Sequence, residues 1–197
     1  MKIYSVLHHE HVQVLRLLDR AHRAEGQKRR ALLDELLDEL TAHSRAEEEV
    51  FYDRLSDTPG VHALMLTAKE EHLVAARLMA DLQVIDVADE RCAAKIGVLA
   101  DSLRHHIEQE EGPLFSFGRQ LFDDVIAANF AGEYLAAKGA ALQIPIEDRL
   151  IEALAMDRFG GASIRLDSGE WAIDDHSFKT LTEEPTANGH LRVSTNS

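Results

Sequence analysis

Apolar residues recur every three or four positions through much of residues 5–111, the spacing that places them on one face of an α-helix. The pattern predicts helices at residues 5–24, 28–55, 61–83 and 90–111. Gly26 is expected to end the first helix, and the turn Asp57-Thr58-Pro59-Gly60 to separate the second from the third. Consecutive amphipathic helices with short connections predict an all-α protein built on an up-down four-helix bundle.

The pattern changes after the last of these helices. Gly112-Pro113 is expected to break or bend that helix, because proline lacks a backbone N–H and clashes with the preceding turn. Further helices are predicted at about 114–138 and 146–158, then a small hairpin from Ile164 to Ile173 around Asp167-Ser168-Gly169 and a mobile tail from Thr182. We therefore expect a bundle at 1–115, a helical extension packing on it at 116–160, and an irregular or hairpin segment with a tail at 161–197.

The extension is rich in large apolar side chains that need a partner. They are Phe115, Phe117, Leu121, Phe122 and Phe130. Two interpretations stay open at this point: these residues pack a further helix against the bundle, or they form a homodimer interface. We favour the intramolecular arrangement.

Composition limits the classes of partner and compartment. The net charge of −14 disfavours nucleic acid, because phosphate binding requires clustered lysine and arginine. The apolar runs are far shorter than the ~20 residues of a membrane span, and the start of the chain does not resemble a signal peptide. Cys92 is the sole cysteine, which suits a reducing compartment. These features predict a cytoplasmic protein that binds neither membranes nor nucleic acid.

A polar motif occurs twice along the chain. Glu10-His11 in the first predicted helix is matched by Glu71-His72 in the third. His43-x-x-x-Glu47-Glu48 in the second helix is matched by His106-x-x-x-Glu110-Glu111 in the fourth. Two similar helix pairs that face each other would form a bundle with approximate two-fold symmetry, and a two-metal site at its centre would follow from that symmetry.

These polar residues lie on the apolar faces of their helices. In the second helix, Leu40, His43, Glu47 and Phe51 follow one another at intervals of three or four residues, and the fourth helix repeats the spacing. A single His-x-x-x-Glu is usually a solvated surface pair. Here it occurs twice on an apolar stripe, each copy with a Glu-His upstream. Buried carboxylates are costly without a partner, so bound cations are expected to neutralise them.

The type of ligand narrows the choice of metal. Imidazole together with carboxylate suits iron, zinc, copper or nickel, whereas calcium and magnesium prefer oxygen ligands. A single four-coordinate zinc would leave several of these side chains unused. Two carboxylates between two metals, with histidines at the ends, suit a di-iron or di-manganese centre.

Taken together, the residues of the repeated motif resemble the hemerythrin-like, or HHE cation-binding, domain over about residues 5–115. The resemblance implies a pair of non-haem iron ions bridged by carboxylates, with manganese and zinc ranked below iron. Under it, the terminal ligands are four histidines and the bridging ligands two glutamates: His11, His43, His72, His106, Glu47 and Glu110.

The sequence departs from the oxygen-carrying hemerythrins at one position. Those proteins have a second histidine one turn after the third-helix histidine, where this chain has Ala76. His8, one turn before His11, is the best substitute ligand. Glu48 and Glu111 rank next, although we expect them to be solvated or to support ligands rather than to bind metal themselves.

The resemblance implies binding of O2 or another small diatomic molecule, in transport, storage or sensing. Two alternatives stay open: a di-iron oxidoreductase that acts on peroxide or nitric oxide, and a partner-binding module that the metal stabilises. A metal- or oxygen-binding protein is favoured over an enzyme.

Overall fold

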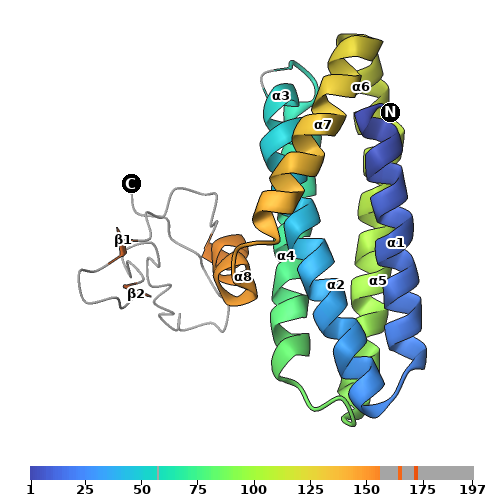
Figure 1. Cartoon of the computed structure of the whole chain (residues 1–197), viewed down its shortest axis with the longest axis vertical. Helices are drawn as coiled ribbons and strands as arrows, with labels where there is room; N and C mark the ends of the chain where they lie inside the picture. The colour runs from blue at the N-terminus through green and yellow to red at the C-terminus, as the bar shows by residue number, and fades with distance from the viewer. Residues whose placement is uncertain (57, 156–163, 166–170, 173–197) are drawn as a thin grey trace, which may run out of the picture. The chain divides into compact units, whose positions relative to one another are not determined.

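The computed structural model describes residues 1–56, 58–155, 164–165 and 171–172 of the chain, which divides into two units at residues 156 and 157. The first unit is a helical bundle (Figure 1). Its long helices are α1 (Ile3–Arg23), α2 (Gly26–Glu47), α4 (His62–Val84) and α5 (Glu90–Gln109). The predicted all-α bundle is therefore confirmed.

Two of these helices pass through a π-helical turn instead of stopping. α2 continues through η1 (Glu48–Tyr52) into α3 (Asp53–Leu55), and α5 through η2 (Glu110–Leu114) into α6 (Phe115–Leu121). Of the break or bend predicted at Gly112-Pro113, a break is wrong, since the helix carries Pro113 inside η2. A π turn holds an extra residue within the helix, which changes the hydrogen-bond pattern at the point where proline offers no N–H.

Local turn and capping residues set the helix boundaries. Gly26 and Gly60 have positive φ angles of 54° and 85°, a conformation that favours glycine. The helix expected at 114–138 is two helices, because Phe122 is extended and Asp123 caps the start of α7 (Asp124–Ala141). The Asp123 side chain accepts hydrogen bonds from the backbone N–H groups of Val125 and Ile126.

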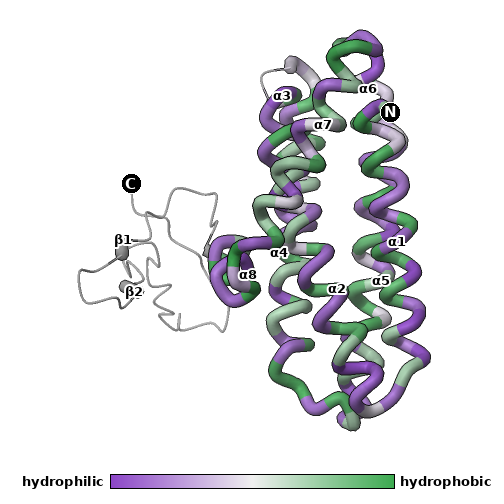
Figure 2. The backbone as a smooth tube through the Cα atoms, viewed as in Figure 1, coloured by the Kyte–Doolittle hydropathy of each residue, from purple (hydrophilic) through white to green (hydrophobic). Residues whose placement is uncertain are grey.

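The core of the bundle consists of two apolar clusters with a polar layer between them. One cluster includes Leu7, Phe51, Met65 and Phe115, and the other includes Val14, Leu36, Met79 and Leu99. α1, α2 and α4 contribute to both clusters, α5 reaches the first cluster through its continuations η2 and α6, and each of the four helices carries a buried histidine. Hydrophobic and hydrophilic positions alternate along these helices (Figure 2). The polar layer holds His11, His43, Glu47, His72, His106 and Glu110.

The helices that follow the bundle pack on its side. α7 contacts α1 and α2, and its Phe130 and Tyr134 belong to the first apolar cluster. α8 (Ile146–Ala155) contacts α2 and α4, where buried Arg149 donates hydrogen bonds to the backbone carbonyl and the carboxylate of Asp38. Of the apolar residues predicted to pack here, Leu121 is instead exposed.

In the second unit the structure describes two short strands. β1 (Ile164–Arg165) pairs antiparallel with β2 (Trp171–Ala172), so that Ile164 faces Ala172. The predicted turn at 167–169 and the predicted tail from Thr182 lie outside the described residues. Among the helices that the structure does describe, none is long and apolar enough to cross a membrane.

Gly118 should tolerate a side chain much less well than Gly132. A Cβ at Gly118 would lie 2.9 Å from the hydroxyl of Tyr4 and 3.2 Å from Phe51, whereas one at Gly132 in α7 would meet nothing within 4 Å. We expect Gly118→Ala to lower the free energy of unfolding by about 1–3 kcal/mol. Gly132→Ala should raise it by about 0.5–1 kcal/mol, because alanine favours helix. Urea unfolding followed by circular dichroism measures both, and equal effects would contradict the packing described here.

Candidate metal centre

The six polar residues of the buried layer come from all four long helices and their continuations. α1 supplies His11, α4 supplies His72, and α2 supplies both His43 and Glu47. α5 and η2 supply the last two, His106 and Glu110. The structure therefore brings together every residue of the predicted ligand set apart from His8.

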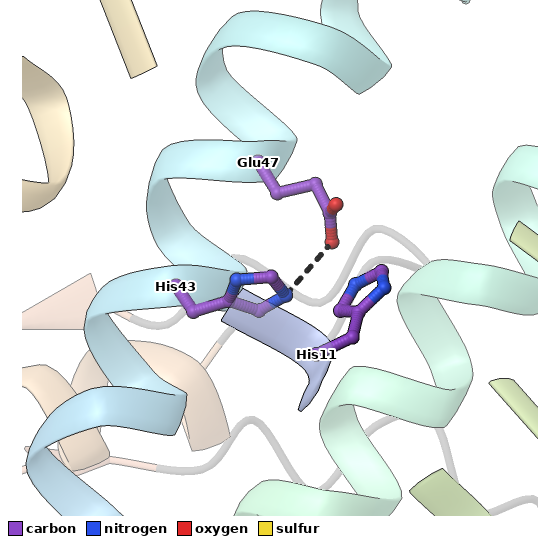
Figure 3. A group of neighbouring side chains, drawn as sticks. All are labelled: His11, His43 and Glu47. Carbon is purple, nitrogen blue, oxygen red and sulfur yellow. Dashed lines mark ion pairs between the residues drawn. The ribbon is translucent and has the colours of Figure 1, made fainter. Parts of the chain in front are cut away.

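One group of candidate ligands consists of His11, His43 and Glu47 (Figure 3). A ligand atom from each of the three lies within 4.8 Å of the others. His43 Nε2 is 3.5 Å from Glu47 Oε2, and the two imidazole rings have centroids 5.1 Å apart. The two histidines converge on the carboxylate from different helices, which is the arrangement a single cation requires.

A second group consists of Glu47, His72 and His106. His72 Nε2 is 3.5 Å from Glu47 Oε2 and 3.1 Å from His106 Nε2. Glu47 belongs to both groups, so one carboxylate lies between two pairs of histidines.

Glu110 reaches both pairs of histidines as well. Its Oε2 lies 3.1 Å from Nε2 of His11, in the first group, and 3.9 Å from Nε2 of His106, in the second. Glu47 and Glu110 therefore stand in equivalent positions, each between an imidazole of one group and an imidazole of the other. Two cations bridged by two carboxylates would fit this arrangement.

Each of the four histidines has a partner at its other ring nitrogen. The Nδ1 contacts are His11 with Glu111 at 2.8 Å, His72 with Glu48 at 2.9 Å, His106 with Glu71 at 2.9 Å, and His43 with the Tyr134 hydroxyl at 2.7 Å. A carboxylate at Nδ1 requires that this nitrogen carries the proton and donates it. Nε2 is then left with a free lone pair that can bind a metal.

The buried carboxylates are the clearest sign that cations belong here. Glu47 and Glu110 are both 0% exposed. Among the described residues no donor meets hydrogen-bond geometry with their four carboxylate oxygens, although His11 Nε2 lies 3.1 Å from Glu110 Oε2. An uncompensated buried carboxylate costs on the order of several kcal/mol. The nitrogen and oxygen donors present suit first-row transition metals such as iron.

Burial shapes the protonation of the site. It lowers the pKa of His43 and of His72, so both imidazoles stay neutral, as metal ligands must be. Burial, together with the negative charge of Glu110, raises the pKa of Glu47 well above its ordinary value. Burial acts in the same direction on Glu110, but the contact with His11 outweighs it and lowers the Glu110 pKa. Without a cation, burial and the mutual repulsion of the two carboxylates therefore favour a proton on this pair.

Aliphatic side chains line a small pocket against the four histidines. They are Val14, Leu40, Leu103 and Ile107. The four histidines therefore have an apolar neighbourhood on one side, into which only a small molecule would fit.

His8 does not lie with the candidate ligands. Its side chain is 61% exposed, and Nδ1 lies 2.8 Å from Glu111, which in turn contacts His11. His8 lies one helical turn before His11, and at this position its side chain points out of the bundle to solvent. Glu48 and Glu111 hold the Nδ1 atoms of histidines, the supporting role expected of them.

Two tyrosines of the site carried no recognisable pattern in the sequence. Tyr52 lies five residues after Glu47, a spacing that brings side chains together in a π turn and not in an α-helix. Its ring stacks on His72 with centroids 5.6 Å apart, and its buried hydroxyl lies near the Glu47 carboxylate. Tyr134 comes from α7, far from the repeated motif.

Comparisons with known proteins identify the family and the fold. The family model described as the Hemerythrin HHE cation binding domain matches residues 2–117. A solved structure of an HHE cation binding domain-containing protein from Mycobacterium kansasii has a TM-score of 0.64 and 22% identity, and the match covers 78% of this chain and 99% of that one. A protein of Nostoc sp. named DNA nickase is 28% identical over 144 residues, which cover 73% of this chain and 41% of that relative. This chain thus spans less than half the length of that relative.

Replacing Glu47 by glutamine should stabilise the metal-free protein, increasingly so as pH rises. Below the ordinary glutamate pKa of 4.5, folded and unfolded chains both carry the proton and the change matters little. Above it the unfolded chain releases the proton while folded Glu47 keeps it up to its raised pKa, so the wild type loses stability by at most about 1.4 kcal/mol per pH unit. Glutamine has no proton to take up, and therefore avoids this loss.

Urea unfolding of the metal-free proteins at about pH 5 and about pH 8 measures the difference. Glu49→Gln, two residues along and exposed, is the control, and should show no such trend. A Glu47→Gln effect that is independent of pH would contradict a raised pKa at this position.

Proposed function

Because the chain belongs to the hemerythrin HHE cation-binding domain family, we propose that it is a non-haem di-iron protein that binds O2 or another small ligand in transport, storage or sensing. The observation that carries the proposal is the position of Glu47 and Glu110. Each fully buried carboxylate lies between histidines of two groups and accepts no hydrogen bond of good geometry from the described residues.

The ligand set divides naturally between two ions. His11 and His43 would hold one ion, His72 and His106 the other, and the carboxylates of Glu47 and Glu110 would bridge them. We propose iron over manganese and zinc, because the set is rich in imidazole and offers two bridging carboxylates.

The set is one imidazole short of the oxygen-carrying members of the family. Ala76 occupies the position of that histidine and is buried. His8 points to solvent, so it is not the replacement. The Tyr52 ring stacks on His72, but burial and the charges of Glu110 and Glu47 raise the pKa of its hydroxyl, which keeps the phenol protonated and disfavours it as a replacement ligand. A ligand-deficient ion would leave a coordination position for a small molecule.

The side chains around the site prepare it for such a ligand. When bound, a pair of iron ions supplies an exchangeable coordination position and the capacity to give or take electrons. The hydrogen bonds at Nδ1 fix each imidazole so that Nε2 faces the centre. Val14, Leu40 and Leu103 provide an apolar wall that excludes water beside the histidines.

Nucleic acid does not fit as a partner of this part of the fold, although a relative is named a DNA nickase. The net charge is −14. Two arginines of a basic cluster, Arg29 and Arg30, are engaged inside the protein, where they donate to the backbone carbonyls of Val87 and Leu82. We propose a small diatomic ligand and a cytoplasmic location.

The first test is the metal content of protein expressed in iron-replete cells. We expect two iron ions per chain in the wild type, the number for which the two groups provide ligands. Glu47→Ala and Glu110→Ala should each abolish loading of both ions, because a bridging ligand serves both. Glu49→Ala, on an exposed position of the same helix, should retain both. Loss of only one ion in each bridging variant would show two separate mononuclear sites.

The second test distinguishes ligand binding from the alternatives. The visible absorption of the iron-loaded protein should change on exposure to O2 or nitric oxide and return when the gas is removed. Steady consumption of peroxide would instead indicate an oxidoreductase. A spectrum insensitive to all three molecules would indicate a metal that only stabilises a partner-binding bundle.

A further inference from the structure

Helix α7 lies outside the region that the family model matches, yet it reaches the candidate metal centre. The match ends at residue 117, and α7 spans Asp124–Ala141. It packs on α1 and α2, the helices that carry His11 and His43. Both ligand histidines of one group are therefore on helices that α7 covers, whereas His72 and His106 are on the other two.

Tyr134 of α7 makes a direct contact with one ligand. Its side chain is 0% exposed, and the hydroxyl lies 2.7 Å from His43 Nδ1, with the two rings edge to face and their centroids 6.0 Å apart. For Nε2 of His43 to bind a metal, Nδ1 must carry the proton and donate it, so the tyrosine oxygen is the acceptor. Burial raises the pKa of Tyr134, which keeps the phenol neutral.

Lys138, one turn further along α7, forms ion pairs with carboxylates of both α1 and α2. It is almost fully buried and forms ion pairs with Glu10 and with Glu39, the latter at 2.7 Å. Glu10 precedes His11, and Glu39 lies one turn before His43. One ammonium group thus joins the segments that present both histidines of this group.

The internal repeat predicts a carboxylate at His43 Nδ1, where α7 instead provides a tyrosine. Glu71 precedes His72 and accepts the Nδ1 proton of His106. Its counterpart in the repeat is Glu10, which by the same symmetry would accept the proton of His43. Instead Glu10 pairs with Lys138, and Tyr134 takes the position at His43 Nδ1. A neutral phenol is a weaker acceptor than a carboxylate, so the two halves of the centre are chemically different.

We propose that Tyr134 and Lys138 are positioning residues that make α7 part of the metal centre. Through them, the ion held by His11 and His43 binds with a different affinity from the other ion. This inference rests on the proposed di-iron function. It assigns a role in metal binding to a helix beyond the family match.

The test is an anaerobic titration of the metal-free full chain with ferrous iron against a competing chelator. Tyr134→Phe keeps the buried ring and removes only the acceptor oxygen. We expect it to weaken binding of one equivalent of iron by about 10–100-fold while the other equivalent keeps its wild-type affinity, as for loss of other hydrogen bonds to metal-ligating histidines. Lys138→Gln is expected to weaken the same equivalent.

Tyr4→Phe is the matched control, because its hydroxyl is also buried in the bundle but contacts no histidine among the described residues. It should leave both affinities unchanged. Wild-type affinities for both equivalents in Tyr134→Phe, or an equal loss in Tyr4→Phe, would overturn the inference. A wild-type chain that binds fewer than two irons would instead overturn the proposed function.

A spectroscopic measurement separates positioning from a general loss of stability. In zinc-loaded protein labelled with 15N-histidine, each ligand histidine should show an Nδ1–H resonance protected from solvent exchange, because all four have an acceptor there. Tyr134→Phe should lose the protection of one resonance, that of His43, and leave the other three. Loss of none, or of all four together, would contradict a specific role for Tyr134.

Discussion

The fold is organised around two carboxylates that water cannot reach. Glu47 and Glu110 are fully buried, and no described residue gives their oxygens a hydrogen bond of good geometry. A bundle that only needed an apolar core would place leucine at both positions, so the polar layer between the two apolar clusters must serve another purpose. Binding of cations explains the polar layer, because their positive charge neutralises the two carboxylates. Four separate helices have to meet at this polar layer for the site to form. The site therefore exists only when the bundle is folded.

The repeat explains how so many polar groups fit without conflict. In each Glu-Glu pair the first residue faces the centre, while the second crosses to a histidine of the other half: Glu48 to His72, and Glu111 to His11. A π turn begins next to Glu47 and at Glu110, and such turns alter the direction of neighbouring side chains within one helix. Each helix pair therefore supplies a bridging group for the centre and a support for its counterpart.

The sequence allowed the bundle and the six candidate ligands to be predicted because both depend on the α-helical period. Features that do not follow the α-helical period were not predicted correctly. The break expected at Pro113 is a π turn, and Tyr52 meets its neighbours only through the other π turn. His8 shares a helical face with His11, but spacing alone does not say where that face meets solvent. Tyr134 lies 91 residues from His43, and no local sequence pattern predicts a contact over that separation.

The same arrangement accounts for how the centre can persist without metal. Burial and the charge of Glu110 raise the pKa of Glu47, which favours a proton on the carboxylate pair, and the contact between Glu110 and His11 satisfies part of the remaining charge. Bound cations would neutralise the carboxylates in place of this proton, so metal affinity should depend on pH and on how firmly the imidazoles are held. Three imidazoles are held by residues of the repeat, and the fourth by α7. The extension therefore acts where the symmetry of the repeat is broken, at the one histidine whose carboxylate partner is engaged elsewhere.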